Sequence, residues 1–214
     1  MRKVISIFLL TFFLISCSSG PQKNANSFIA QYGIKDPVPH RFKICFSYGC
    51  NKSEMVQLSD GQWDRIRKVF KPASTDASME RKKIAQSISI LESIVGKLTK
   101  TNGDIGGTFP GVFMRNQMDC EDEAINTSTY LTMLKKDNMI NFHDLREPAR
   151  RGYFLNGWPH MAPVISEKGS GKKYVVDAWF LDNGELPFIL KYNEWKDGWR
   201  PEKNFDNRDQ TPSY

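Results

Sequence analysis

Apolar residues recur with helical spacing in the middle of the chain. In the longer stretch they follow one another at steps of four and three residues, as on one helix face: Ile84, Ile88, Leu91, Val95 and Leu98. A shorter stretch begins after Ser59, which has capping-box spacing from Gln62, and ends before Pro72. We therefore expect two helices here and place the longer apolar face in the core.

Segments rich in aromatic and β-branched residues predict strands. The first pair is expected at 41–46 and 55–58, joined by a turn over 47–52. After a Gly-rich loop over 99–118 and a helix from Cys120 to about Lys136, further strands are expected near Tyr153 and at 161–165, 174–180 and 187–190. Turn residues at 169–171 and 182–184 suggest successive hairpins. Helices followed by antiparallel strands indicate an α+β fold.

The composition is that of one globular domain. The 214 residues include 40% hydrophobic and 25% charged side chains, unlike a collagen or a disordered chain. The formal net charge is +6, but two basic residues lie in the leader described next, so 28 basic minus 24 acidic side chains leave +4. Because this excess is weak and dispersed among acids, we expect no nucleic-acid partner.

The N-terminus resembles a secretory signal. Arg2 and Lys3 precede an apolar run over 4–15, which is shorter than the roughly 20 residues that a membrane-spanning helix needs. The run ends in Leu-Ile-Ser-Cys, which resembles the bacterial lipobox, so residues 1–16 would be the signal peptide and Cys17 would carry acyl chains such as palmitate. The alternative is an ordinary signal peptide with a chance cysteine. Ser18 favours the outer membrane, facing the periplasm, if the source is Gram-negative.

The segment that follows is polar. Residues 17–39 are rich in Ser, Gly, Asn, Gln and Pro and show no sustained apolar period, which is typical of a flexible tether. We therefore expect the folded domain at 40–214, held to a membrane through the N-terminal lipid.

The other three cysteines divide into a pair and a single residue. Cys45 and Cys50 flank a predicted turn, so in an oxidising compartment we expect a disulfide between them. Cys120 is then left alone. A zinc site would need two more ligands, and His40 with His143 gives no recognised spacing.

Cys120 and two later residues form a candidate catalytic set. Asp119 is a plausible N-cap, which places Cys120 at a helix N-terminus, where the dipole lowers a thiol pKa and N–H groups can hold an oxyanion. His160 opens a predicted strand, and Asp177 lies 17 residues later in the next one, where it can orient the imidazole. Singly, the three could be a packing cysteine, a strand-end histidine and the partner of an arginine. Together they predict a nucleophile, a base and an orienting acid.

These motifs resemble the bacterial transglutaminase-like cysteine peptidases of the papain-like superfamily. The similarity covers about 117–190: Asp-Cys-Glu-Asp-Glu-Ala at a helix start, a strand-opening histidine and Val-Asp in the next strand. It implies a papain-like core, with the nucleophile helix packed on an antiparallel sheet, and assigns the catalytic roles to Cys120, His160 and Asp177. No cofactor is required. Some relatives hold calcium beside the thiol, which here would fall on Asp119 and Glu121, with Asp122 as a third acid. The alternative, which we prefer, is that these acids cap the helix.

The oxyanion donors and the substrate cleft have candidates of their own. The backbone N–H of Cys120 is the natural first donor. The side-chain amide of Gln117 is a candidate second donor, and Asn116 could serve instead, or both could be plain loop residues. Trp158 could wall a substrate cleft or simply fill the core.

The sequence therefore predicts a lipid-anchored cysteine hydrolase of the cell envelope. A thioester acyl-enzyme would be released by water, and a protein or peptide is the expected substrate. An amine acceptor would give transamidation instead, and peptidoglycan or other amides use the same first half-reaction. The rival hypothesis is a non-catalytic envelope lipoprotein that uses the same fold as a binding module.

Overall fold

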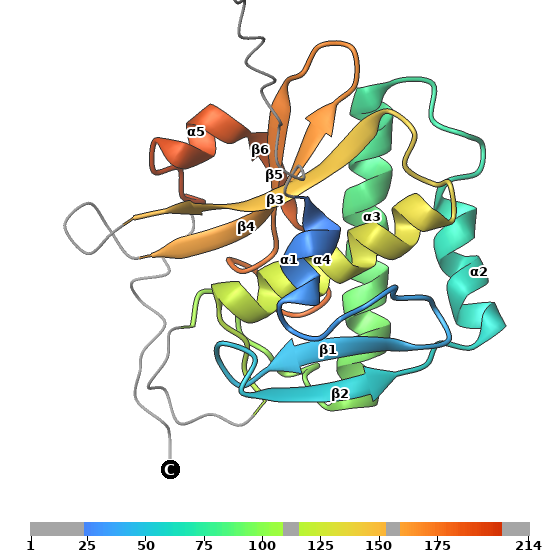
Figure 1. The fold of residues 1–214 in the computed structure, drawn as a ribbon, viewed down its shortest axis with the longest axis vertical. Helices are drawn as coiled ribbons and strands as arrows, with labels where there is room; N and C mark the ends of the chain where they lie inside the picture. Colours follow the sequence, from blue (N-terminus) through green and yellow to red (C-terminus); the bar gives the residue numbers. More distant parts are fainter. Residues whose placement is uncertain (1–23, 109–115, 153–158, 203–214) are drawn as a thin grey trace, which may run out of the picture.

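The computed structural model describes residues 24–108, 116–152 and 159–202 (Figure 1). Its helices are α1 (Ala25–Ala30), α2 (Asp60–Val69), α3 (Ala77–Thr99), α4 (Cys120–Lys136) and α5 (Tyr192–Lys196), and its strands are β1 (Phe42–Phe46), β2 (Lys52–Val56), β3 (His143–Arg151), β4 (His160–Glu167), β5 (Lys173–Asp177) and β6 (Phe188–Lys191). Helices and antiparallel sheets are both present, so the fold is α+β, as predicted. No helix in the described ranges is long and apolar enough to cross a membrane.

The larger sheet brings the ends of two strands together. Its four strands lie in the order β3-β4-β5-β6, and each pairs antiparallel with its neighbour. Val164 of β4 faces Val175 of β5, so the start of β4 and the end of β5 lie at the same edge. His160 and Asp177 occupy these two positions, and Arg151 at the end of β3 pairs with His160.

Helix α4 crosses the middle of the molecule, between this sheet and the β1–β2 pair (Figure 1). Every residue from Asp122 to Leu134 is buried, because different sides of α4 contact β1, β4, α1 and α3. The main core joins α3, α4 and the sheet through residues such as Ile88, Leu131 and Val176. The predicted apolar face of α3 is buried except at Leu98, which is 45% exposed, so that part of the prediction is wrong.

The β1–β2 pair carries the predicted disulfide. Cys45 and Cys50 are bonded, and Asn126 of α4 both donates to the Cys45 carbonyl and accepts from its N–H, each at 2.8 Å. The chain turns sharply at 47–50, where all four residues have a left-handed φ. Because the turn is this tight, β2 begins at Lys52, earlier than the predicted strand at 55–58.

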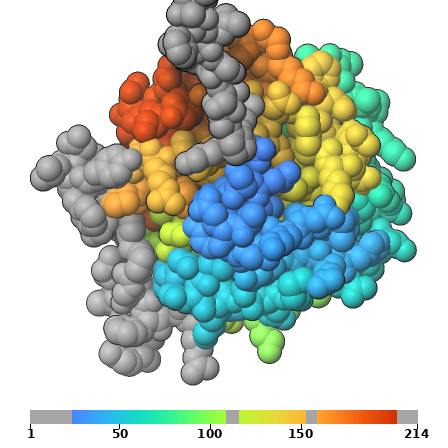
Figure 2. All heavy atoms as spheres, in the orientation of Figure 1, coloured from blue at the N-terminus to red at the C-terminus, as the bar shows by residue number. Residues whose placement is uncertain are grey.

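The expected tether is folded from residue 24 onward, which corrects the predicted domain start at 40. Asn24 caps α1 in a capping box with Ser27, and Phe28, Ile29 and Ile34 are buried beside Ala124, Ile125 and Met161. Figure 2 shows α1 and the β1–β2 pair forming one continuous face of the molecule. The apolar residues here are too few for a periodic signal, so the polar composition dominated the prediction. Residues 1–23, with Cys17, lie outside the described residues.

Strand β3 was not predicted. Its sequence, HDLREPARR, is mostly charged and contains Pro148, yet it forms an edge strand whose register with β4 shifts between Arg146 and Ala149. A shift of this kind accommodates a proline, which cannot donate to the ladder. The strand expected near Tyr153 lies outside the described residues.

Candidate active site

The sequence places Cys120 at the first position of α4, as predicted. Asp119 is the N-cap: its side chain accepts from the N–H groups of Glu121 and Asp122 at 3.1 and 2.9 Å. The Asp122 carboxylate in turn accepts a longer hydrogen bond, 3.4 Å, from the Asp119 N–H, which completes a capping box. The helix therefore begins at a fixed residue, and the half-buried thiol projects from its first turn.

The thiol of Cys120 lies against the backbone on both sides of His160. It donates to the carbonyl of Pro159, at 3.8 Å, and the backbone N–H of Met161 also bonds to it. No hydrogen bond joins the sulfur to the imidazole within the described ranges. The fold thus brings the predicted nucleophile and the predicted base into adjacent positions.

His160 and Asp177 form a buried pair. The ring Nε2 lies 2.7 Å from Asp177 Oδ2, and the side chains are 5% and 1% exposed. A carboxylate only accepts, so Nε2 carries the proton, and Nδ1 of the neutral ring has a free lone pair. Nδ1 is buried and has no partner in the described part of the chain.

Aromatic rings enclose this imidazole. The centroids of Trp179, Phe180 and Trp195 lie 4.7, 5.1 and 5.4 Å from that of His160. The predicted strand over 174–180 ends at Asp177, and the chain then turns so that Trp179 and Phe180 pack on the ring. Sequence reasoning missed Trp195, which lies on the short helix α5 and has no motif around it.

Burial raises the pKa of the Cys120 thiol to about 12. The hydrogen bond from Met161 opposes this shift, but the negative charges of Asp119, Asp177 and Glu121 add to it. The expectation that the helix N-terminus lowers this pKa is therefore wrong, because desolvation and neighbouring acids outweigh the dipole. The resting thiol is neutral.

The acids beside the thiol already have protein partners. Glu121 accepts from the Tyr32 hydroxyl at 2.5 Å, and Asp122 accepts from the N–H groups of Tyr48 and Cys50 at 2.7 and 2.6 Å. Asp119 caps the helix, as in the alternative that we preferred. No group of three or more potential metal ligands occurs among the described residues. Calcium at Asp119 and Glu121 stays a prediction from the resemblance.

The amides proposed for the oxyanion hole hold the Gly-rich loop. Gln117 is buried, accepts from the Ile105 N–H at 2.9 Å and donates to the Gly103 carbonyl at 2.8 Å. Asn116 donates to the Lys100 carbonyl at 3.0 Å. The role of Gln117 as an oxyanion donor stays a prediction, whereas the backbone N–H of Cys120 donates to none of the described residues. Trp158 lies outside the described residues.

Three buried acids were not predicted: Glu92 of α3, Asp104 of the Gly-rich loop and Glu123 of α4. Burial, with repulsion from nearby carboxylates, raises the pKa of Glu92 and of Asp104 to about 8 and that of Glu123 well above its usual value. Asp104 accepts from the Met118 N–H at 2.6 Å and so ties the loop to the helix start.

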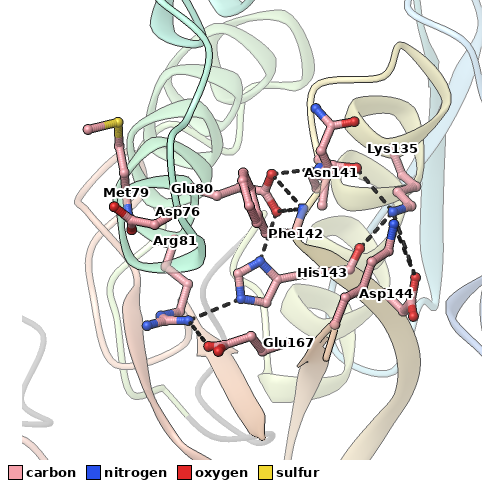
Figure 3. Close-up of polar contacts among 12 residues, drawn as sticks. Asp76, Met79, Glu80, Arg81, Lys135, Asn141, Phe142, His143, Asp144 and Glu167 are labelled. Atoms are coloured by element: carbon pink, nitrogen blue, oxygen red, sulfur yellow. Dashed lines mark hydrogen bonds and ion pairs between the residues drawn. The ribbon is translucent and has the colours of Figure 1, made fainter. Parts of the chain in front are cut away.

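A second buried histidine pair (Figure 3) involves His143, which pairs with Glu167 at the opposite end of the β3–β4 ladder from His160. Nδ1 of His143 lies 2.8 Å from Glu80, and Nε2 lies 3.1 Å from Arg81, which also bonds Glu167 at 2.9 Å. His40 is exposed and lies 3.5 Å from Asp60. The ligands considered for zinc, His40 and His143, therefore have separate partners.

No family model, no curated protein and no solved structure matches this chain.

Proposed function

We propose that this protein is a lipid-anchored, transglutaminase-like thiol hydrolase that cleaves peptide or amide bonds in the cell envelope. The observation that carries the proposal is the His160–Asp177 pair. Nδ1 of this histidine has no partner among the described residues, and the two backbone groups that contact the Cys120 thiol flank the same histidine. The nucleophile helix α4 packs on β4 of an antiparallel sheet, which supports a papain-like core.

The proposed reaction starts from a neutral pair. His160 Nδ1 takes the thiol proton as Sγ attacks the substrate carbonyl carbon, and Asp177 stabilises the imidazolium that forms. The backbone N–H of Cys120, which donates to none of the described residues, bonds the developing oxyanion. The imidazolium then protonates the leaving amine, and water, activated by His160, hydrolyses the thioester. With an amine in place of water, the same intermediate gives transamidation.

The high thiol pKa sets a condition on this mechanism. Because the resting sulfur is protonated, proton transfer to His160 must accompany attack or follow a small approach of the two groups. The aromatic rings around His160 exclude water and favour this transfer over loss of the proton to solvent.

The membrane assignment rests on the N-terminal sequence. Arg2, Lys3, the apolar run and the lipobox-like end support acylation of Cys17 and placement at the outer membrane, facing the periplasm. Metabolic labelling with an alkyne-tagged palmitate should mark the unaltered chain and leave Cys17→Ala unmarked. Equal labelling of both proteins would contradict the assignment.

The alternative is a non-catalytic envelope binding module with the same fold. The raised pKa of the Cys120 thiol favours it, because a protonated thiol is a poor nucleophile. The two functions differ in whether the thiol reacts when an electrophile is offered.

An acyl-transfer assay separates them. The full chain is mixed with 4-nitrophenyl acetate, the burst of nitrophenolate is measured and the acylated residue is located by mass spectrometry. We expect acetyl on Cys120 that turns over with time, no burst for Cys120→Ser, and a burst slowed about 100-fold for His160→Ala. His40→Ala, which removes an exposed imidazole, is the control and should match the unaltered protein. Acylation spread over surface lysines, or an unchanged burst in His160→Ala, would favour the binding module.

A further inference from the structure

The carboxylate of Asp177 has a second donor besides His160. Trp195 donates its indole Nε1–H to Asp177 Oδ2 at 2.7 Å, the same distance at which that oxygen bonds the imidazole. The other oxygen, Oδ1, is buried without a partner in the described part of the chain. Both bonds that orient this carboxylate therefore end on one oxygen.

Trp195 is itself fixed by its surroundings. Its side chain is fully buried, and it packs with Ala162, Val164 and Val175 of β4 and β5. The Arg151 guanidinium lies over the indole, 4.5 Å from the ring centroid, and donates to the carbonyls of Trp195 and Trp199. A cation over the ring polarises the indole and makes its N–H a stronger donor.

From these contacts we infer that Trp195 is a positioning residue for the proposed reaction, acting through Asp177 on the orientation of His160. The inference rests on the proposed function. Without the indole N–H, His160 is the one partner of Oδ2 left among the described residues, and the carboxylate can rotate about its Cβ–Cγ bond. The imidazole then loses the partner that keeps its proton on Nε2 and its lone pair on Nδ1.

The molecule holds a matched control for this contact. Trp63 donates its indole N–H to Asp137 Oδ2 at 2.7 Å, and that oxygen also accepts from Arg67 Nε at 2.8 Å. The indole–carboxylate distance is the same, but among the described residues no histidine or thiol bonds this carboxylate. Trp195→Phe and Trp63→Phe therefore remove the same bond in two places, only one of which leads to the candidate site.

The test uses two readouts on the full chain. Nitrogen-15 spectra of the imidazoles report which ring nitrogen of His160 carries the proton, and iodoacetamide measures the reactivity of Cys120 at neutral pH. In Trp195→Phe we expect part of the His160 population to lose the Nε2–H form and alkylation to slow about 10-fold, the effect of one hydrogen bond to a charged group. Trp63→Phe should change neither readout.

An isostere guards against a variant that fails to fold. Trp195→3-benzothienylalanine keeps the ring shape and replaces N–H by sulfur, so packing is retained and only the donor is lost. We expect the same shift in tautomer and in alkylation as for Trp195→Phe. If the isostere keeps the tautomer and the alkylation rate of the unaltered protein, the inference is overturned.

The two proposals fail in different ways. If alkylation is insensitive to His160→Ala, the proposed function is wrong, yet the tautomer of His160 still reports whether Trp195 acts through Asp177. If His160→Ala slows alkylation while the position-195 variants change neither readout, the function stands and the positioning role is wrong.

Discussion

Two buried histidines bond carboxylates at nearly the same distance, but they use their second ring nitrogens differently. His160 lies 2.7 Å from Asp177 and His143 lies 2.8 Å from Glu80. In His143 both nitrogens are occupied, because Arg81 donates to Nε2 (Figure 3). In His160 the second nitrogen is buried without a described partner, and the Cys120 thiol contacts the backbone on both sides of this residue. A buried histidine–carboxylate pair therefore has a structural role when both ring nitrogens are hydrogen-bonded. It is a candidate general base when the second nitrogen lacks a partner.

The two carboxylates also differ in their support. Glu80 accepts from the N–H groups of Asn141 and Phe142 as well as from His143, and these bonds hold its pKa below the usual value although burial acts in the opposite direction. It braces the chain that leads from α4 into β3. Among the described residues, Asp177 accepts from two side chains, those of His160 and Trp195, so these contacts serve the imidazole.

Neutralising each carboxylate should give opposite results. Asp177→Asn should slow acylation of Cys120 by about 10³-fold, because an amide favours the wrong imidazole tautomer, and should change the unfolding free energy little. Glu80→Gln should lower the unfolding free energy by about 2 kcal/mol, because the NH₂ group that replaces one carboxylate oxygen cannot accept a hydrogen bond. This variant should leave acylation intact. Urea unfolding and the nitrophenolate burst measure the two effects. Equal loss of acylation in both variants would mean that the pairs do not differ in function.

Removing the disulfide tests whether a change at the start of α4 affects the His160–Asp177 pair without affecting the His143–Glu80 pair. Replacing Cys45 and Cys50 by serine should lower the unfolding free energy by about 2 kcal/mol, since a short closed loop removes little entropy from the unfolded chain. The loop bonds Asp122 in the first turn of α4, so the imidazole signal of His160 should shift while that of His143 does not. Finding both thiols free in protein isolated from the envelope would remove the basis of this prediction.

Two groups of acids should titrate with opposite effects on stability. The pKa of Glu80 is lowered, so its contribution is present above the usual pKa of glutamate and is lost as pH falls below that value. The pKa values of Glu92 and Asp104 are raised to about 8, so their protonated forms favour the folded state and stability is lost as pH rises from about 5 to 8.

Urea unfolding across this pH range tests the second effect. The unfolding free energy should decline between pH 5 and 8, and Glu92→Gln should flatten the decline, because glutamine cannot ionise. Glu185→Gln on the surface is the control and should leave the slope unchanged. The same dependence of the unfolding free energy on pH in the unaltered protein, Glu92→Gln and Glu185→Gln would contradict the raised pKa of Glu92.

The sequence carried much of the local structure and the three residues of the candidate site. The capping box at Ser59, the N-cap at Asp119 and the apolar period of α3 are short-range signals, and the elements that they predict are present. Cys120 and His160 could be selected because each begins a predictable element, and Asp177 because a carboxylate in an apolar strand needs a partner. Their catalytic roles remain a proposal.

Tertiary contacts explain what the sequence did not reveal. Strand β3 is charged and contains Pro148, so only pairing with β4 makes it a strand. Residues 24–39 read as polar, and α1 is stabilised by a few contacts with α4. The raised pKa of Cys120 depends on burial and on acids from separate elements, and the bond from Trp195 to Asp177 joins helix α5 to strand β5. None of these leaves a pattern along the chain.

The most direct test of the central claim is the pH dependence of Cys120 alkylation by iodoacetamide in the full chain, compared with His160→Ala and His143→Gln. An open nitrogen on His160 predicts a reactive thiol near neutral pH in the unaltered protein and in folded His143→Gln. In His160→Ala the thiol should react only as the pH approaches its own high pKa. The same profile in all three proteins would show that His160 does not act on the thiol, and the binding module would be the better account.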